Sequence, residues 1–329
     1  MTASETAGID LSIIILNYDT KALVLECFES LYKFKPTINF EIILVNNGSK
    51  RDRADEFEGL YPEVRVVDLE KNVGFGEGNN VGMRVARGRY FLLLNSDAFY
   101  FDNSLQVAYD YALDNPQTDI FGCSVLNPDH TPQDCTFLAY PSSNLIAAVM
   151  NVWNTNVVVR KLGLSNTKLG RGKLGGLVGC YILLKREVFE QTGGFDPDFL
   201  IYCEETEWFR NRIAKAGFTM DICKEAQVVH LVGGSDPKGL RFKQNILSNY
   251  LYWYKLGYGP FAVNLLGTMI NLLVAALVTP LVSERERSQH TRIIKTHFKV
   301  LPQVFTDVLR YPNKFGSRPS ALTIEEYRS

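Results

Sequence analysis

A carboxylate stands directly after one of the most apolar stretches of the chain. Residues 90–94 read Tyr-Phe-Leu-Leu-Leu, and Asn95, Ser96 and Asp97 follow them. An uncharged run of this length is typical of a strand buried on both faces, and open α/β sheets bind ligands beyond the carboxyl ends of such strands. We therefore expect Asp97 at a sheet edge, where it could bind Mg²⁺ or Mn²⁺ together with a phosphate. A helix cap is the alternative for an isolated Asp.

A pair of acids later in the chain has the composition of a general base. Glu204 and Glu205 stand at the start of an expected helix, and the apolar Trp208 and Phe209 follow at helical spacing. A carboxylate whose pKa is raised by burial in a cleft can take a proton from an attacking hydroxyl. The alternative is structural, because acids in a first helical turn complement the helix dipole.

Apolar runs and helical patterns alternate in the first hundred residues, and they must position these acids. The expected strands are residues 11–16, 40–45, 64–69 and 90–94, and the helical patterns are residues 20–33, 51–60 and 81–86. This alternation predicts a doubly wound, mostly parallel α/β sheet with helices on both faces. Each apolar run ends in polar, loop-forming residues, so these ends should share one edge of the sheet.

A glycine-rich stretch, Gly74 to Asn80, follows the third apolar run. It lacks the full GxGxxG spacing and does not follow the first strand, so it is weak support for a dinucleotide site. Two interpretations stay open. The stretch could be a tight strand-to-helix turn, or its backbone N–H groups could approach a phosphate or ribose at a helix N-terminus.

Composition excludes several classes of protein. The 329 residues allow one large domain or two modest ones. The net charge of −1 provides no global basic field, so we expect no nucleic-acid partner. The six cysteines form no CxxC pair, which argues against a zinc site or a disulfide framework and fits the cytoplasm. Residues 1–10 are polar and lack the apolar core of a secretory signal.

Several further motifs accompany these residues in a fixed order. The first half contains residues 12–18, 45–49, 72–80 and 94–97, and the second half contains residues 193–199, 204–208 and 216–218 and His230 with Gly233 and Ser235. In this order the motifs resemble family 2 inverting glycosyltransferases over residues 11–235, closest in character to bacterial rhamnosyltransferases of O-antigen or other surface polysaccharides.

The resemblance implies a division of the chain. A polar tail at 1–10 would precede a GT-A glycosyltransferase domain at 11–236, and a helical region would follow at 237–329. Within the domain, the resemblance implies a nucleotide-binding half at 11–126 and an acceptor half at 127–236.

The resemblance also assigns roles to site residues. Asp97 would bind the metal as the last residue of a DxD-type motif whose first acidic position is Asn95 here, and His230 would be a second metal ligand. Asn46 stands where the family commonly has Asp, and its amide oxygen can still accept a hydrogen bond from a pyrimidine N3–H. The other expected nucleotide-binding residues are Asn17, Tyr18, Gly48, Gly74, Asn79, Asn80, Asn95 and Ser96.

The resemblance places the catalytic base at the second acidic position of its motif, which is Glu205. The interval from Glu205 to Ala216 is one residue longer than we expect for the family. Either the intervening helix carries an extra residue, or Glu204 is the base.

An uncharged segment, residues 261–282, is long enough to span a bilayer. However, Asn264, Thr268 and Asn271 recur on one face of the expected helix and Pro280 interrupts its end. Such a polar stripe favours an amphipathic helix that lies on a membrane surface or packs on protein over a single span. A buried helix, a homo-oligomer interface and a true span are the alternatives.

The flanks of this segment favour the membrane surface. Tyr250, Tyr252, Trp253, Tyr254 and Tyr258 precede it, and such rings are enriched at membrane interfaces. Residues 283–320 carry eight Lys or Arg against three acids, which would attract anionic lipids on the cytoplasmic side. We therefore expect a peripheral location on the inner face of the cell membrane.

These observations together predict a metal-dependent inverting glycosyltransferase that uses Mg²⁺ or Mn²⁺. It would move a sugar, preferably L-rhamnose from dTDP-rhamnose, to a hydroxyl of a polyprenyl-diphosphate-linked saccharide. One alternative is another donor, such as a UDP-hexose or a galactofuranose. A second alternative is a sugar-nucleotide nucleotidyltransferase, but such an enzyme usually has a glycine-rich, basic loop where this chain has Asn17 to Thr20. A third alternative is a binding scaffold that has lost its catalytic activity, which the uncharged Asn46 and Asn95 suggest.

Overall fold

The chain folds as two compact units. The computed structural model describes residues 8–138, 143–164, 174–231 and 240–310. The first unit consists of residues 1–137, 174–197 and 204–236, and the second of residues 138–173, 198–203 and 237–329. Two helices from the range expected for the acceptor half, α4 (Asn144–Thr155) and α5 (Val157–Lys161), therefore belong to the second unit with the C-terminal helices.

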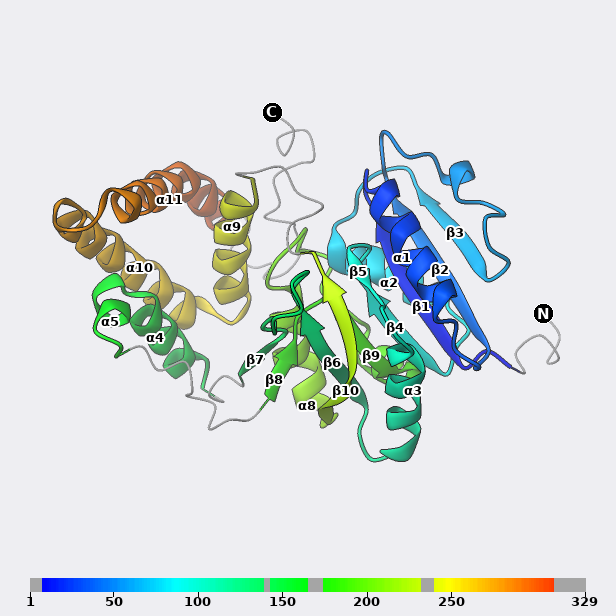
Figure 1. The fold of residues 1–329 in the computed structure, drawn as a ribbon. Helices are drawn as coiled ribbons and strands as arrows, with labels where there is room; N and C mark the ends of the chain where they lie inside the picture. The colour runs from blue at the N-terminus through cyan, green and yellow to red at the C-terminus, as the bar shows by residue number, and fades with distance from the viewer. Residues whose placement is uncertain (1–7, 139–142, 165–173, 232–239, 311–329) are drawn as a thin grey trace. The chain divides into compact units, whose positions relative to one another are not determined.

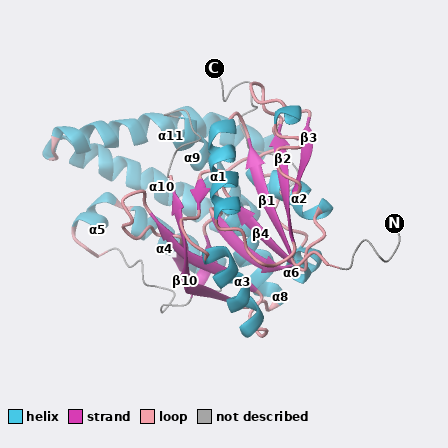
Figure 2. Ribbon diagram, turned by 45° about the vertical axis from the view of Figure 1, so that its right-hand side comes forward, coloured by secondary structure: helices cyan, strands magenta, loops and turns pink. Residues whose placement is uncertain are grey.

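The first unit is built on an eight-stranded sheet with the order β3-β2-β1-β4-β9-β6-β10-β5 (Figure 1, Figure 2). Its strands are β1 (Leu11–Asn17), β2 (Phe40–Asn47), β3 (Val64–Leu69), β4 (Tyr90–Leu94), β5 (Ala98–Phe99), β6 (Ile120–Leu126), β9 (Tyr181–Lys185) and β10 (Met220–His230). Strands β3, β2, β1 and β4 are parallel, whereas β9 is antiparallel to both neighbours, β4 and β6. Strand β10 is parallel to β6 and antiparallel to β5. The predicted mostly parallel α/β sheet is confirmed.

Helices cover both faces of this sheet because successive residues of a buried strand point to opposite sides. Ile13 of β1 packs in one core with α1 (Lys21–Lys33) and α3 (Ser104–Asp114). Ile14 packs in the other core with α2 (Phe75–Val85) and α6 (Arg186–Thr192). Strand β2 is buried along its whole length, as expected for a parallel strand covered on both faces. A separate two-stranded sheet joins β7 (Thr136–Leu138) and β8 (Leu174–Leu177).

The glycine-rich stretch after β3 is mostly helix rather than loop. Gly74, with a φ of +93°, stands at the N-cap, and α2 begins at Phe75, six residues before the helix predicted at 81–86. A Cβ atom at Gly78 would lie 2.6 Å from Leu16 Cδ2, and one at Gly82 would lie 2.5 Å from Ile14 Cγ2. The glycines therefore let α2 lie close against β1.

The helix predicted at residues 51–60 is wrong. This segment contains one short 3₁₀ turn, Ala54–Glu56, and then bends at Gly59, whose φ is +71°. Phe57 is its buried residue, so the segment has too little apolar surface to hold a longer helix against the sheet.

The second unit is helical, with α9 (Leu240–Lys255), α10 (Tyr258–Val278) and α11 (Glu284–Arg310) beside α4 and α5. The polar stripe expected on α10 faces protein. Asn271 Nδ2 donates to the backbone oxygen of Val152 (2.8 Å), and Asn156 Nδ2 donates to Asn271 Oδ1 (2.7 Å). Asn264 is also buried. Pro280 lies in a 3₁₀ turn, Thr279–Leu281, that follows α10.

The aromatic cluster before α10 is not an interfacial belt. Tyr250, Tyr252, Trp253 and Tyr254 are buried in the core of the helical unit together with Phe261. Aromatic residues at helical spacing more often form a core than a membrane anchor, because each ring removes a large apolar area from water. The expectation that these four rings face a membrane is therefore wrong, whereas Tyr258 is half exposed.

Candidate active site

The two expected metal ligands, Asp97 and His230, meet at one end of the sheet. Asp97 follows β4, and His230 is the last residue of β10 and pairs with Ala98 of β5. The Nε2 atom of His230 lies 3.3 Å from Oδ1 of Asp97 and 3.4 Å from Nδ2 of Asn95. Asp97 is buried, with 5% of its surface exposed. The antiparallel β5–β10 pair thus joins residues 133 positions apart in the sequence.

The geometry of this pair fits a divalent cation. Nδ1 of His230 is 2.7 Å from Oε1 of Gln133. In the tautomer whose Nδ1–H donates to Gln133, Nε2 carries a lone pair and faces the carboxylate. Two acceptors 3.3 Å apart repel each other unless a proton or a cation lies between them. An ion with bonds of about 2.0–2.1 Å could take both atoms as neighbouring ligands.

Two protein ligands are few for a structural metal site but sufficient for Mg²⁺ or Mn²⁺ beside a phosphate. Within the described ranges, no group of three His, Cys, Asp or Glu residues could hold an ion. Such ions often take one or two protein ligands, and substrate phosphates and water complete the shell. Gln133, which orients His230, was missed by sequence reasoning because it lies in a loop that only the fold brings to His230.

Asn17 and Asn46, at the ends of β1 and β2, form a buried side-chain network. Asn17 Nδ2 donates to Asn46 Oδ1 (2.9 Å), and Asn46 Nδ2 donates to Asp68 Oδ1 (2.8 Å). The register of β2 and β3 places Asn46 opposite Asp68. The exposed carboxylate of Asp68 therefore lies next to Asn46, the position at which the resembling family commonly has Asp. Sequence reasoning missed Asp68, although its place near the end of the third strand was a signal that could have found it.

Asn79 and Asn80 of α2 have clear structural roles. Asn80 Nδ2 donates to the backbone oxygen of Phe195, and Asn80 Oδ1 accepts from the N–H of the same residue, both at 2.9 Å. Asn79 Nδ2 donates to the backbone oxygen of Phe75 (3.0 Å). These bonds satisfy two buried amides and tie α2 to the loop after α6. Contact with the nucleotide stays a prediction for both residues.

The remaining expected nucleotide-binding residues lie in or beside the loops at the strand ends. Gly48 has a φ of +67°, and a Cβ atom there would be 2.2 Å from the backbone carbon of Lys71, so only glycine fits. Gly74 is the N-cap of α2. Ser96 is buried and Tyr18 is half-buried. The structure places these residues near strand ends, and their binding roles stay predictions.

Glu204 and Glu205 begin a continuous helical segment that contains a π-helical turn. Helix α7 (Glu204–Glu207) leads into a π-helical segment, Trp208–Ile213, and then into α8 (Ala214–Ala216). A π-helical turn holds one more residue than an α-helical turn. This agrees with an extra residue in the helical segment between Glu205 and Ala216. The choice between Glu205 and Glu204 as the base stays a prediction.

The two glutamates have different environments. Glu204 is 1% exposed, and its Oε2 atom has no hydrogen-bond partner among the described residues. Glu205 is partly exposed, and its Oε1 atom accepts a hydrogen bond from the N–H of Gly179 (3.1 Å). A Cβ atom at Gly179 would lie 2.8 Å from this oxygen. Glycine at this position therefore lets the backbone approach the carboxylate.

Burial raises the pKa of both glutamates. The pKa of Glu204 is raised well above its usual value by burial and then by the charge of Glu205. Burial also raises the pKa of Glu205, while backbone hydrogen bonds, including that from Gly179, oppose the rise. Two adjacent buried carboxylates disfavour double ionisation. The pair therefore favours a proton on Glu204 and a charge on Glu205, which is the form that a general base needs.

Cys180, directly before β9, lies in the electrostatic field of both Asp97 and Glu205. The backbone N–H of Asn95 donates to the oxygen of Cys180 (3.1 Å). Burial, neighbouring Cys135, Asp97 and Glu205 together raise the pKa of the Cys180 thiol to about 12. The segment Gly179–Cys180 thus bonds to Glu205 at one residue and to Asn95, two residues before Asp97, at the next.

The backbone that leads into Glu204 is strained. Tyr202 and Cys203 have φ values of +71° and +69°, a left-handed conformation that side chains rarely adopt. Such residues cost about 1–3 kcal/mol each and persist where the surroundings hold them. Helix α9 holds this segment. Ser248 Oγ donates to the backbone oxygen of Ile201 (2.7 Å), and a buried ion pair joins Lys255 Nζ to Asp198 Oδ2 (2.6 Å).

We predict that Glu204→Gln stabilises the protein at neutral and alkaline pH. The folded pKa of Glu204 is raised, so folded protein keeps a proton that unfolded protein has lost, and stability falls as pH rises above about 4.5, the usual Glu value. A neutral Gln removes this loss. We expect a gain of about 0.5–2 kcal/mol at pH 8 that shrinks towards pH 4.5, measured by thermal unfolding.

Glu58→Gln is the matched control, because Glu58 is exposed. It should leave the pH dependence of unfolding unchanged. Equal behaviour of the two variants, or a loss of stability in Glu204→Gln at pH 8, would show that Glu204 is ionised in the folded protein.

Two curated relatives are similar to part of the chain. Over 199 residues, it is 27% identical to an uncharacterized glycosyltransferase of Haemophilus influenzae, with 58% of this chain and 60% of that protein covered. Over 209 residues, it is 25% identical to the N-acetylglucosaminyl-diphospho-decaprenol L-rhamnosyltransferase of Mycobacterium tuberculosis, with 57% and 66% covered. The chain therefore spans less than two thirds of the length of these relatives.

The fold is similar to that of solved glycosyltransferases, which confirms the predicted GT-A fold. The mannosyltransferase PcManGT from Pyrobaculum calidifontis, solved in complex with GDP-Man and Mn²⁺, gives a TM-score of 0.53 at 15% identity over 90% of this chain and 88% of that chain. The structure of GalNAc-T7 with UDP, GalNAc and Mn²⁺ gives a TM-score of 0.51 at 17% identity, over 75% of this chain and 48% of that chain. The model of glycosyl transferase family 2 matches residues 12–193, more than half of the chain, and the chain belongs to this family.

Proposed function

We propose that the protein is a metal-dependent inverting glycosyltransferase. One observation carries the proposal: Asn95, two residues before Asp97, bonds to the backbone of Cys180, and Glu205 accepts a hydrogen bond from the neighbouring Gly179. A cation site for a diphosphate and a carboxylate base next to it are the two groups that such a transfer needs.

The nucleotide would bind along the ends of β1, β2 and β3. Asn46 has one acceptor lone pair left after its bond from Asn17, and Asp68 adds a full charge beside it. These two acceptors suit the N3–H of a pyrimidine, and a charged acceptor makes the stronger bond. Asp68 thus supplies the charge that Asn46 lacks and weakens the alternative of a lapsed scaffold.

In the chemical step, Glu205 takes the proton of the acceptor hydroxyl. The hydroxyl oxygen forms a bond to the anomeric carbon from the face opposite the leaving group, and the bond from that carbon to the phosphate oxygen breaks. The nucleoside diphosphate leaves with the electron pair, so the configuration inverts. A divalent ion held by Asp97 and His230 would supply positive charge for the leaving diphosphate. Mn²⁺ in both similar structures supports a divalent ion here.

For the substrates, we propose L-rhamnose from dTDP-rhamnose as the donor and a polyprenyl-diphosphate-linked saccharide as the acceptor. The name of the Mycobacterium tuberculosis relative supports both choices. An O-antigen biosynthesis protein of Myxococcus xanthus, 25% identical over 221 residues, supports a surface polysaccharide as the product. Another sugar nucleotide is the second candidate, because the two similar structures hold GDP-Man or UDP with GalNAc.

The different environments of the glutamates predict opposite outcomes for two matched variants. Glu205→Gln removes the base, so kcat should fall by about 10²–10⁴-fold while nucleotide binding stays close to that of the wild type. Glu204→Gln replaces a neutral acid by a neutral amide of the same shape and should keep most of the turnover. Steady-state kinetics and nucleotide titration measure both. A large loss of kcat in Glu204→Gln, with turnover largely kept in Glu205→Gln, would make Glu204 the base.

If Asp97 holds the cation, Asp97→Ala should weaken nucleotide binding only when the metal is present. We expect a loss of more than about tenfold with Mn²⁺ and little change with a chelator, since one contact to a charged group is worth about 1.5–3 kcal/mol. Calorimetric titration of dTDP or UDP measures this. Asp114→Ala, at the exposed end of α3, is the control. Undiminished metal dependence in Asp97→Ala would refute the assignment.

The donor can be identified by the release of nucleoside diphosphate. With Mn²⁺ and a polyprenyl-diphosphate saccharide, we expect acceptor-dependent release from dTDP-rhamnose and much slower release from UDP-hexoses and GDP-mannose. Faster release from one of the other donors would keep the mechanism and replace the sugar. Tight nucleotide binding without release from any donor would favour a lapsed scaffold.

A further inference from the structure

Helix α10 turns two asparagines toward protein and exposes a stripe of large apolar residues. Asn264 and Asn271 face the helical unit and are buried or hydrogen-bonded there. The opposite side carries Leu266, Ile270, Leu273 and Leu277, which are between 60% and 68% exposed. These four residues recur at spacings of four, three and four, so they form one stripe. A helix on the surface of a water-soluble protein shows the reverse pattern.

Helix α4 packs against α10 (Figure 1). It adds a second apolar stripe. Leu145, Ile146, Val149 and Trp153 are each about half exposed. Neither α4 nor α10 contains a charged residue. Two adjacent, uncharged helices therefore expose eight large apolar side chains, more than the scattered apolar residues of an ordinary surface.

The charge of the chain is divided sharply between its two units. The residue ranges of the helical unit contain 18 Lys and Arg against six Asp and Glu, whereas those of the sheet unit contain 17 against 30. The net charge of −1 for the whole chain hides this division. A strongly basic unit that also exposes apolar helices has the two properties that favour anionic lipid surfaces.

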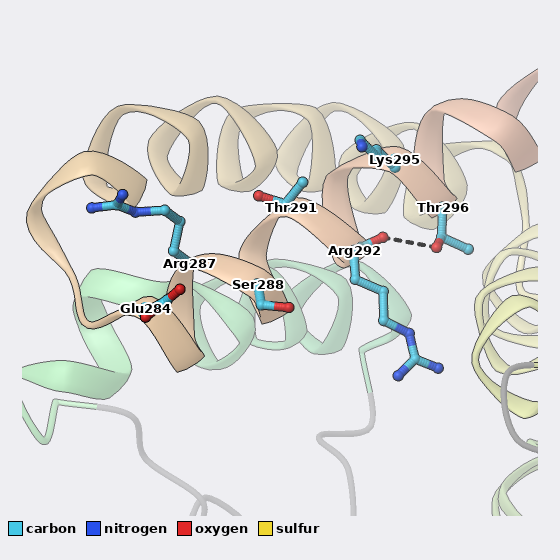
Figure 3. Close-up of a pocket in the computed structure, with 7 residues that line it drawn as sticks. All are labelled: Glu284, Arg287, Ser288, Thr291, Arg292, Lys295 and Thr296. Atoms are coloured by element: carbon cyan, nitrogen blue, oxygen red, sulfur yellow. Dashed lines mark hydrogen bonds between the residues drawn. The ribbon is translucent and has the colours of Figure 1, made fainter.

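Part of this positive charge lies on the exposed side of α11. A shallow depression there is lined by Arg287, Arg292 and Lys295 and by one acid, Glu284 (Figure 3). Three cations against one acid, together with Ser288 and Thr291, suit anionic headgroups rather than an apolar ligand. Their attraction to a charged surface acts over about one Debye length, roughly 8–10 Å.

We propose that the apolar stripes of α10 and α4 dock the helical unit on the surface of an anionic lipid bilayer. The stripes enter the boundary between headgroups and acyl chains, and the basic residues of the unit attract the anionic headgroups. Trp153 is half exposed, and tryptophan side chains are enriched at this boundary. Docking would bring the protein to the membrane in which a polyprenyl-linked acceptor lies. This benefit rests on the proposed function.

Two alternatives to docking on a bilayer surface, a membrane-spanning helix and an interface with a second copy of the chain, fit less well. The segment Tyr258–Leu281 is the helix in the described part of the chain that is long and apolar enough to cross a membrane. However, its polar side is hydrogen-bonded to α4 and to Asn156, which begins the basic helix α5, so crossing would take those polar groups along. A second copy of the chain would bring two strongly basic units together, which repel each other.

Vesicle binding tests the proposal. The full-length protein is mixed with phosphatidylcholine vesicles that contain or lack phosphatidylglycerol, and bound protein is measured by co-sedimentation. We expect binding to the anionic vesicles that salt weakens. The double variant Leu273→Glu, Leu277→Glu should weaken this binding at least about tenfold, because each leucine contributes apolar burial in the interface. Both positions are exposed, so the fold tolerates the change.

A matched control uses an exposed leucine of the sheet unit. Leu113→Glu, at 44% exposure, should bind vesicles like the wild type. Equal binding of the double variant and the wild type would overturn the proposal. So would concentration-dependent dimerisation without vesicles that the double variant abolishes, or retention of the native protein in membranes after alkaline extraction.

The proposal and the proposed function can fail separately. Turnover of the double variant with a short-chain, water-soluble acceptor should equal that of the wild type, because the altered leucines are not in the catalytic machinery. Vesicle binding without sugar transfer from any donor would refute the function and leave the docking surface. Transfer by a protein that does not bind anionic vesicles would refute the docking surface alone.

Discussion

The antiparallel pairing of β9 with β4 is the constraint on which the candidate active site depends. Leu94 pairs with Tyr181, so the backbone of Cys180 bonds to Asn95, two residues before Asp97. The preceding residue, Gly179, then donates its N–H to Glu205. A single strand register thus links the expected cation site to the expected base. A shift by one residue would turn the side chains of β9 to the opposite face and break both links.

The site is maintained against unfavourable local energies. One buried oxygen of Glu204 has no hydrogen-bond partner in the described part of the chain, and Tyr202 and Cys203 hold left-handed backbone conformations directly before it. These features are tolerable because the sheet core and helix α9 fix the segments on either side. Buried carboxylates and strained backbone at one place are typical of functional sites, where stability is given up for a set protonation state and geometry.

The two units divide the physical tasks. The acidic sheet unit contains the strand ends, the Asp97–His230 pair and the glutamates. The basic helical unit contains the residues that hold the segment before Glu204, since residues 198–203 leave the sheet unit and pack with α9. The surface that we propose for lipid docking and the segment that leads into Glu204 therefore belong to the same unit, and the peptide bond between Cys203 and Glu204 connects that unit to the proposed base.

Local patterns in the sequence determined the strands and the polar residues at their ends. The apolar-rich runs that became β1, β2 and β4 are buried in a sheet covered on both faces, and β3 extends that sheet, so their polar ends share one edge. The same local reasoning failed where long-range packing decides. The sequence places the predicted helix six residues too late, because the close contact of the glycines with Leu16 and Ile14 is not visible along the chain.

Only the tertiary structure decided which partners the site residues have. Gln133 contacts His230 from 97 residues away, Asp68 contacts Asn46 from 22 residues away, and Gly179 contacts Glu205 from 26 residues away. Strand register sets such pairs, and no local spacing encodes it. The orientation of α10 is of the same kind. Its polar stripe was plain in the sequence, but only packing against α4 showed that the stripe points inward and the leucines outward. An amphipathic pattern defines two faces of a helix, and the neighbouring helices decide which face meets water.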